Sequence, residues 1–193
     1  MNGGDGGSHR FISNQNASNL RFAISRGGAN TFALFGANTS GTTNLTITTS
    51  STILAGSGWH IILASWDIGT DDNHIYLDGS SDISVTTSDN TNIDYTSVQW
   101  AVGADGNAGA NKFNGDIDVL YLNLAEKIDF SSSTNRLKFF DAAGKWVPSR
   151  MDGGQEPTGN QPIIYLPGTY RSFSANHGSG GGFNVTGALT ESA

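Results

Sequence analysis

The chain has 193 residues, of which 26 are glycine, 36% are hydrophobic and only 14% are charged. This composition disfavours helices, because Ser, Thr and Asn compete for backbone hydrogen bonds and Gly costs about 1 kcal/mol at a helical position. The net charge of −7 argues against a nucleic-acid partner, and the absence of cysteine excludes disulfides. Neither a membrane-spanning helix nor a signal peptide is expected, since no apolar run has the required length and position.

Apolar and polar residues alternate along most of the chain, which predicts many short strands. In chain order, these strands are predicted at residues 10–14, 19–26, 30–37, 44–54, 59–66, 74–79, 97–104, 115–124, 162–168 and 183–190. A Ser/Thr start and a Gly stop predict one short helix at residues 132–144. Because turn residues separate the strands at regular short intervals, the pattern indicates an all-β antiparallel sandwich.

The segment GWHIILASWDIGTDDNHIYLDGS, residues 58–80, predicts two strands joined by an acidic turn. A turn centred near residue 69 or 70 would pair His74 with Ser65 and place His60 opposite Gly79. The two histidines would then lie roughly 17 Å apart and could not share a metal ion. We expect His60 to be a sheet residue with a local hydrogen bond, and the aspartates to serve the turn.

The order of several motifs resembles the concanavalin A-like jelly roll of the laminin-G/pentraxin type. These motifs are a Trp-His-hydrophobic strand, an acidic turn, IYLDG, and a glycine-rich loop before FNGDIDVLYLN, within residues 9–125. The resemblance implies a jelly-roll sandwich at residues 1–130 and a turn-rich C-terminal extension at 131–193. Domains of this kind normally begin with further strands. The opening strands are therefore expected to be missing, and a final strand of the extension or a partner could replace them.

The C-terminal part resembles the end of lectin-like structural proteins encoded by bacteriophages. The residues that carry this resemblance are LKFFDAAGKWVPSRMDGGQEPTGNQPIIYLPG and, further on, SANHGSGGGFNVTGALT. It implies a virion protein that binds carbohydrate or a host-surface receptor; the alternative is a purely structural or decoration protein without a glycan ligand. The expected partners are other virion subunits, in a homo-oligomer or multi-copy assembly, and a cell-surface glycan; neither nucleic acid nor membrane insertion is expected.

The chain is expected to be non-catalytic. Glycoside hydrolases that share the fold resemble one another in a Glu-x-Asp-x-x-Glu strand, which supplies two carboxylates on one face. The corresponding segment here, NGDIDVLYLNLAE, places Asp116 and Asp118 on one face, but its glutamate, Glu126, lies beyond the strand. The histidines have no serine in a G-x-S-x-G context, and GSGGGF lacks the Lys-Ser/Thr of a phosphate loop.

A calcium site is the open alternative to the expectation of no cofactor. In pentraxins an Asp-Asn pair before an early strand meets an acidic loop before a late strand, and calcium prefers such oxygen ligands. This resemblance makes Asn19, Asp105 and Asn107 candidate calcium ligands. Ser18 stands where the family has Asp, and the loop holds no Glu, so any such site would be weak.

Aromatic residues in polar loops are candidates for stacking on a sugar ring. Tyr95 and Tyr170 lie in such loops, and with Asp105 and Asn107 they are the candidate carbohydrate-binding residues. Most of the four tryptophans are expected to fill the core instead.

Overall fold

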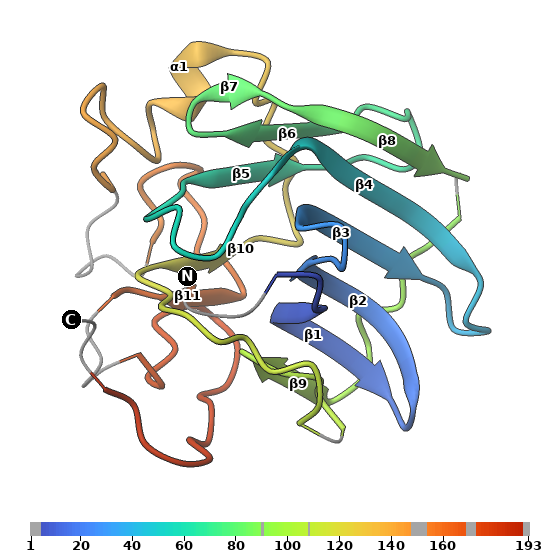
Figure 1. The fold of residues 1–193 in the computed structure, drawn as a ribbon. Coiled ribbons are helices and arrows are strands. Elements are labelled where there is room, and N and C mark those ends of the chain that lie inside the picture. The colour runs from blue at the N-terminus through green and yellow to red at the C-terminus, as the bar shows by residue number, and fades with distance from the viewer. Residues whose placement is uncertain (1–4, 90, 108, 148–153, 169–172, 191–193) are drawn as a thin grey trace. The chain divides into compact units, whose positions relative to one another are not determined.

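The computed structural model describes residues 5–89, 91–107, 109–147, 154–168 and 173–190 (Figure 1). The strands are β1 (His9–Asn16), β2 (Asn19–Arg26), β3 (Thr31–Ala37), β4 (Thr43–Thr52), β5 (Ile62–Ser65), β6 (His74–Leu77), β7 (Ser80–Ser81), β8 (Ile83–Ser88), β9 (Gln99–Val102), β10 (Leu120–Leu122) and β11 (Ile164–Leu166). The described residues contain one short helix, α1 (Ser133–Arg136). The predicted all-β antiparallel fold is confirmed.

The chain divides into two compact units, Met1–Gly115 and Asp116–Ala193. The first unit contains β1 to β9, and the second contains β10, α1 and β11. The boundary predicted after residue 130 therefore lies inside the second unit. No helix in the described residues combines the length and apolarity that a membrane crossing requires.

A six-stranded antiparallel sheet with the strand order β8-β4-β3-β2-β1-β9 forms most of the first unit. One face of this sheet carries the apolar core, where Phe22, Leu34, Leu45 and Ile47 are completely buried. The register explains the shared face, because Leu34 pairs with both Ile24 and Ile47, and directly paired residues point to the same side.

The hairpin of β5 and β6 has the register predicted from the sequence. Ser65 pairs with His74. Asp67 and Asp72 exchange two backbone hydrogen bonds, of 3.1 and 3.2 Å, across the turn. Asp71 adopts a left-handed backbone with φ of 55°, a conformation that Asp and Asn tolerate better than other residues. The aspartates therefore serve the turn, as expected.

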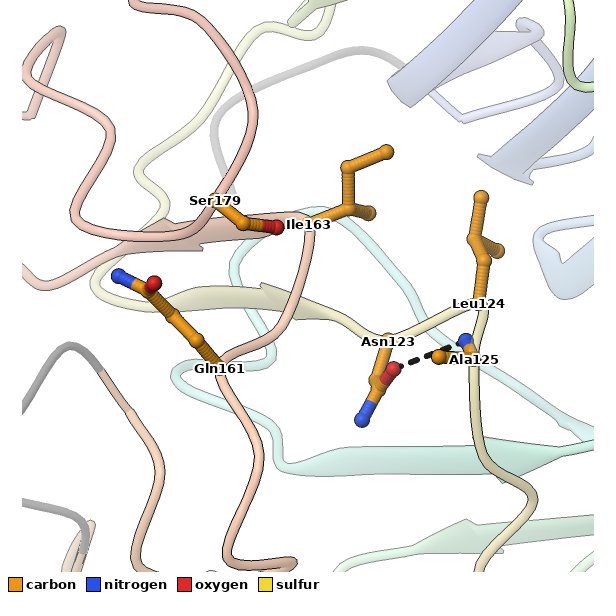
Figure 2. A pocket seen from close by; sticks show the side chains of 6 residues that line it. All are labelled: Asn123, Leu124, Ala125, Gln161, Ile163 and Ser179. Carbon is orange, nitrogen blue, oxygen red and sulfur yellow. Dashed lines mark hydrogen bonds between the residues drawn. The ribbon is translucent and has the colours of Figure 1, made fainter.

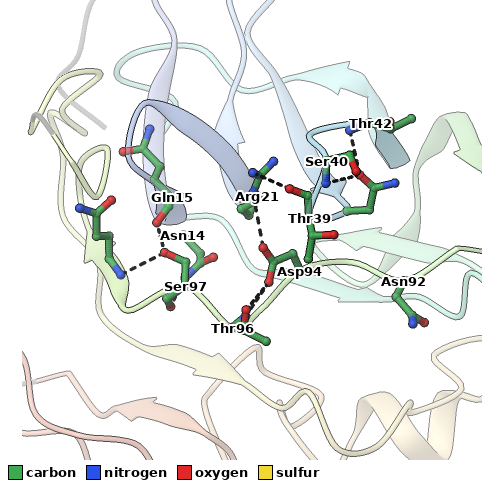
Figure 3. Close-up of polar contacts among 12 residues, drawn as sticks. Asn14, Gln15, Arg21, Thr39, Ser40, Thr42, Asn92, Asp94, Thr96 and Ser97 are labelled. Carbon is green, nitrogen blue, oxygen red and sulfur yellow. Dashed lines mark hydrogen bonds and ion pairs between the residues drawn. The ribbon is translucent and has the colours of Figure 1, made fainter.

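The connection from β8 to β9 passes from one edge of the six-stranded sheet to the other and is tied to the strands between them (Figure 3). Hydrogen bonds join Asn44 to the Asn92 carbonyl (2.9 Å), the Asp94 N–H to the Ala37 carbonyl (2.8 Å), and Asn14 to the Ser97 carbonyl (2.8 Å). Ile93 packs against Gly36, where an added Cβ would lie 2.5 Å from the Ile93 Cδ1. Gly36 is thus needed for the close approach of this connection.

A buried ion pair between Arg21 and Asp94 completes these contacts, with 3.4 Å between Nε and Oδ2 (Figure 3). Hydrogen bonds from the hydroxyl and then the backbone N–H of Thr96 lower the pKa of Asp94 below 3.8; burial opposes this shift and Arg21 adds to it. Arg21 also donates from Nη2 to the Thr39 carbonyl at 2.9 Å. Because the guanidinium of Arg21 and the carboxylate of Asp94 bind to each other and to neighbouring residues of the fold, we assign the pair a structural role.

The second unit is organised around the pairing of β10 with β11, in which Tyr121 lies opposite Tyr165. Phe139 and Trp146 contact Tyr121, with ring centroids 5.3 and 6.1 Å away, respectively. The Trp146 indole also donates to the Tyr165 hydroxyl at 3.1 Å. An aromatic cluster therefore forms the core of this unit.

Two predicted elements of the second unit differ from the structure. The helix predicted at 132–144 is limited to the four residues of α1, and Ser132 forms no side-chain cap there. Residues 183–190 form no strand, and Val185 and Leu189 are 45% and 40% exposed. Alternation alone did not make a strand here, because an amphipathic strand also needs a sheet edge and a core to cover its apolar face.

Candidate functional site

Tyr95, one of the predicted sugar-stacking residues, lies in the aromatic core of the first unit. Its hydroxyl accepts a hydrogen bond from the Trp66 indole at 3.0 Å, and its ring centroid is 5.4 Å from that of Phe22. Burial raises the pKa of Tyr95 to about 12, against the opposing effect of the hydrogen bond from Trp66. Because the ring packs within this cluster, we assign Tyr95 a structural role.

Asp105 and Asn107 lie together in the loop after β9, where the Asp105 carboxylate and the Asn107 backbone N–H are engaged within the fold. Arg10 contacts one carboxylate oxygen of Asp105 at 2.9 Å, and Asn111 donates to the other at 2.6 Å. The Asn107 N–H donates to the Gln15 side chain at 2.6 Å. These contacts hold the loop against β1.

Asn19, the third candidate calcium ligand, begins β2 at the turn from β1. Among the described residues, no hydrogen bond or ion pair joins Asn19 to Asp105 or Asn107. A cation at Asp105 would have to displace the guanidinium of Arg10. Calcium binding therefore stays a prediction, without support from this geometry, and Tyr170 lies outside the described residues.

Trp59 differs from the other tryptophans in its exposure, which reaches 63%. Trp66, Trp100 and Trp146 each contact another aromatic ring, at centroid distances of 5.6, 6.1 and 5.2 Å, respectively. Trp59 lies before the first residue of β5, in the loop that follows β4. It therefore offers a large apolar ring to solvent at one end of the β5–β6 hairpin.

Three polar side chains form a connected array, and two of them, Ser57 and His60, lie on either side of Trp59 in the sequence. The Ser57 Oγ lies 2.8 Å from the His60 Nε2, and the His60 Nδ1 lies 2.8 Å from the Asp78 Oδ2. The Ile61 N–H donates to the other carboxylate oxygen at 2.8 Å. His60 has the predicted local hydrogen bond, but it lies two residues before β5 and is therefore not the sheet residue that the sequence predicted. We call these three residues the Ser57–His60–Asp78 array.

Backbone turns hold both ends of the array. Gly56 and Gly58 flank Ser57 with φ of 78° and 94°, in the left-handed region that favours glycine. Asp78 and Gly79 also have positive φ, of 50° and 83°, in a two-residue connection from β6 to β7 of the kind that Asp-Gly favours. The sequence signal for this site was AGSGW, in which glycines on both sides of a serine mark a turn.

A shallow pocket in the second unit offers another set of neutral polar groups (Figure 2). Its cavity volume is about 310 Å³. The lining residues are Asn123, Leu124, Ala125, Gln161, Ile163 and Ser179. The Asn123 Nδ2 is buried without a hydrogen-bond partner among the described residues, while Gln161 donates to the His177 carbonyl at 2.7 Å. This pocket has no aromatic wall.

Comparison with known proteins identifies the family. The family model for the concanavalin A-like lectin/glucanases superfamily matches residues 1–122, which include the whole first unit. Searches of curated proteins and of solved structures found no significant match. With more than half of its residues matched and an antiparallel β architecture, the chain belongs to the concanavalin A-like lectin/glucanase superfamily.

Proposed function

We propose that the protein is a lectin-like binding module that holds a carbohydrate against Trp59. The observation that carries the proposal is the 63% exposure of the Trp59 side chain next to oriented polar groups. Sugar rings present apolar C–H faces that pack on aromatic rings, while their hydroxyls need hydrogen-bond partners. The surface beside Trp59 supplies both kinds of contact.

Asp78 is the polar group best suited to a sugar hydroxyl. Its side chain is 50% exposed, and each carboxylate oxygen has accepted one of the roughly two hydrogen bonds that it can take. The remaining acceptor sites are fixed in direction by His60 and by the Ile61 N–H. Such fixed groups lower the entropy cost of binding.

A glycan array with the wild-type protein and two variants tests the proposal. Trp59→Ala is expected to weaken binding at least about fivefold, since an aromatic contact contributes about 1 kcal/mol or more. Val98→Ala, at a residue that is 93% exposed, is the matched control and should bind as the wild type does. If Trp59→Ala binds normally and Asn123→Ala does not, the carbohydrate site is the pocket of the second unit, and the proposal for Trp59 fails.

We further propose that the protein is a virion component of a bacteriophage that works in multiple copies on a host-surface glycan. The resemblance of residues 137–168 and 174–190 to phage lectin-like proteins supports this role. The alternative is a structural or decoration protein, which would bind no glycan. Binding to bacterial surface polysaccharides separates the two, and light scattering that shows only a monomer at micromolar concentration would contradict the assembly.

A further inference from the structure

Ser57, His60 and Asp78 stand in the order of a nucleophile, a general base and an orienting carboxylate. The two distances of 2.8 Å lie within the reach that proton transfer requires. We propose that the Ser57–His60–Asp78 array is a catalytic site for hydrolysis of carboxylic esters, such as an acyl group on a sugar hydroxyl. That the alcohol is a sugar rests on the proposed function; the acyl transfer itself does not.

The carboxylate of Asp78 decides which nitrogen of His60 carries the proton. A carboxylate only accepts hydrogen bonds, so the His60 Nδ1 must be the donor to it. In the neutral imidazole, Nε2 is then left as the acceptor for the Ser57 hydroxyl. This tautomer is the one that a general base needs.

The Leu54 carbonyl gives Ser57 a second position for its single proton. The Ser57 Oγ lies 2.7 Å from this oxygen as well as 2.8 Å from the His60 Nε2. The hydroxyl donates to the Leu54 carbonyl in one orientation and turns to the His60 Nε2 in the other, where it can give up its proton.

Backbone donors follow the nucleophile directly. The N–H groups of Gly58 and Trp59 have no hydrogen-bond partner among the described residues. In acyl-transfer enzymes, N–H groups beside the nucleophile stabilise the oxyanion. Ser57 is exposed, so an ester on a glycan can reach it without movement of the fold. The sequence-based expectation of a non-catalytic chain rested on the missing glucanase carboxylates and on the absence of a serine in a G-x-S-x-G context. Ser57 lies in AGSGW, a different turn, and this chemistry uses no glucanase carboxylate.

The reaction balances with water as the only co-reactant. The Ser57 Oγ bonds to the ester carbonyl carbon while its proton passes to the His60 Nε2. The bond between the carbonyl carbon and the alcohol oxygen of the ester then breaks, and the alcohol leaves with the proton that His60 had taken up. Water then attacks the acyl-serine, gives its proton to His60, and releases the acid as Oγ regains a proton.

The test combines labelling with kinetics on the full chain. A fluorophosphonate probe should modify Ser57, as located by peptide mass spectrometry, and the protein should hydrolyse p-nitrophenyl acetate. Ser57→Ala and His60→Ala should each lower the rate at least about tenfold, whereas Ser81→Ala, at another exposed serine, should not. Asp78→Asn should also lower the rate, because the His60 imidazole then loses the carboxylate that orients it.

Absence of the label, or equal rates in Ser57→Ala and the wild type, would overturn the proposal. The contact of Ser57 with His60 would then be only a turn contact. Failure of the proposed carbohydrate binding would give a different result: Trp59→Ala would bind glycans as the wild type does, whether or not the protein hydrolyses esters.

Discussion

Replacing Tyr95 by Phe removes one oxygen from the aromatic cluster of the first unit and leaves the rings in place. The Trp66 indole loses the acceptor that lies 3.0 Å away. A buried donor left without a partner costs about 1–3 kcal/mol, and the partial exposure of both side chains favours the lower end of this range. We expect the free energy of unfolding to fall by about 1 kcal/mol in urea denaturation followed by tryptophan fluorescence.

The pH dependence of Tyr95→Phe gives a second, independent readout. In the folded state the pKa of Tyr95 is raised from 10.0 to about 12. Between pH 10 and pH 12 the folded protein holds the Tyr95 proton that the unfolded chain has lost. The contribution of Tyr95 to the free energy of unfolding is therefore fully present below pH 10 and decreases as the pH rises to about 12. The loss reaches about 3 kcal/mol for a shift of about two pKa units. Tyr95→Phe should lose this part of the slope.

A double-mutant cycle with Trp66→Phe controls for other effects of the substitution. In the Trp66→Phe background, Tyr95→Phe should cost almost nothing, because no indole donor remains. The reasoning would be refuted if both substitutions had additive effects, or if Tyr95→Phe kept the full slope between pH 10 and 12. A role of Tyr95 in glycan binding would instead appear as a loss of binding at unchanged stability.

Three further predictions concern stability. Gly36→Ala should cost about 1–3 kcal/mol, because its Cβ would lie 2.5 Å from Ile93; the double variant with Ile93→Ala should be more stable than the sum of the two effects implies, as measured by thermal unfolding. Asp71→Asn with Asp72→Asn should change stability by no more than about 0.5 kcal/mol, with or without a chelator, unless the turn binds a metal. Asp94→Asn should cost about 3 kcal/mol, because it leaves a buried guanidinium unpaired. Since the pKa of Asp94 lies below 3.8 in the folded protein, its contribution to stability is present above about pH 4 and is lost as the pH falls further. If Asp94→Asn lost stability below about pH 4 as steeply as the wild type does, this reasoning would be contradicted.

The sequence predicted the strands best where apolar residues alternate over long runs. β2 to β4 lie within a residue or two of their predicted bounds, and the pairing of Ser65 with His74 followed from the position of the turn. β8 was missed, because ISVTTS contains mostly Ser and Thr and gives no clear apolar alternation. Its strand forms by pairing with β4, a long-range contact that local pattern does not reveal.

The candidate site could be predicted only in part. The apolar run at residues 59–66 predicts a strand that begins at Trp59, but β5 begins three residues later, at Ile62, and the Trp59 ring is exposed outside the sheet. Tyr95 has polar neighbours in sequence, yet hydrogen bonds to β3 and to Trp66 hold the connection that contains it against the sheet. Whether the side chain of Trp59 or of Tyr95 is exposed depends on contacts with strands that are distant in the sequence, which the local pattern does not reveal.

Carbohydrate contact at Trp59 is tested most directly by nuclear magnetic resonance of the isotope-labelled protein. The indole N–H signals of the four tryptophans are assigned with single Trp→Phe variants and followed while a glycan from the array is added. We predict that the Trp59 signal shifts in a saturable way, while the signals of the three packed tryptophans stay in place. A saturable shift of the Asn123 side-chain amide with an unmoved Trp59 signal would contradict the account.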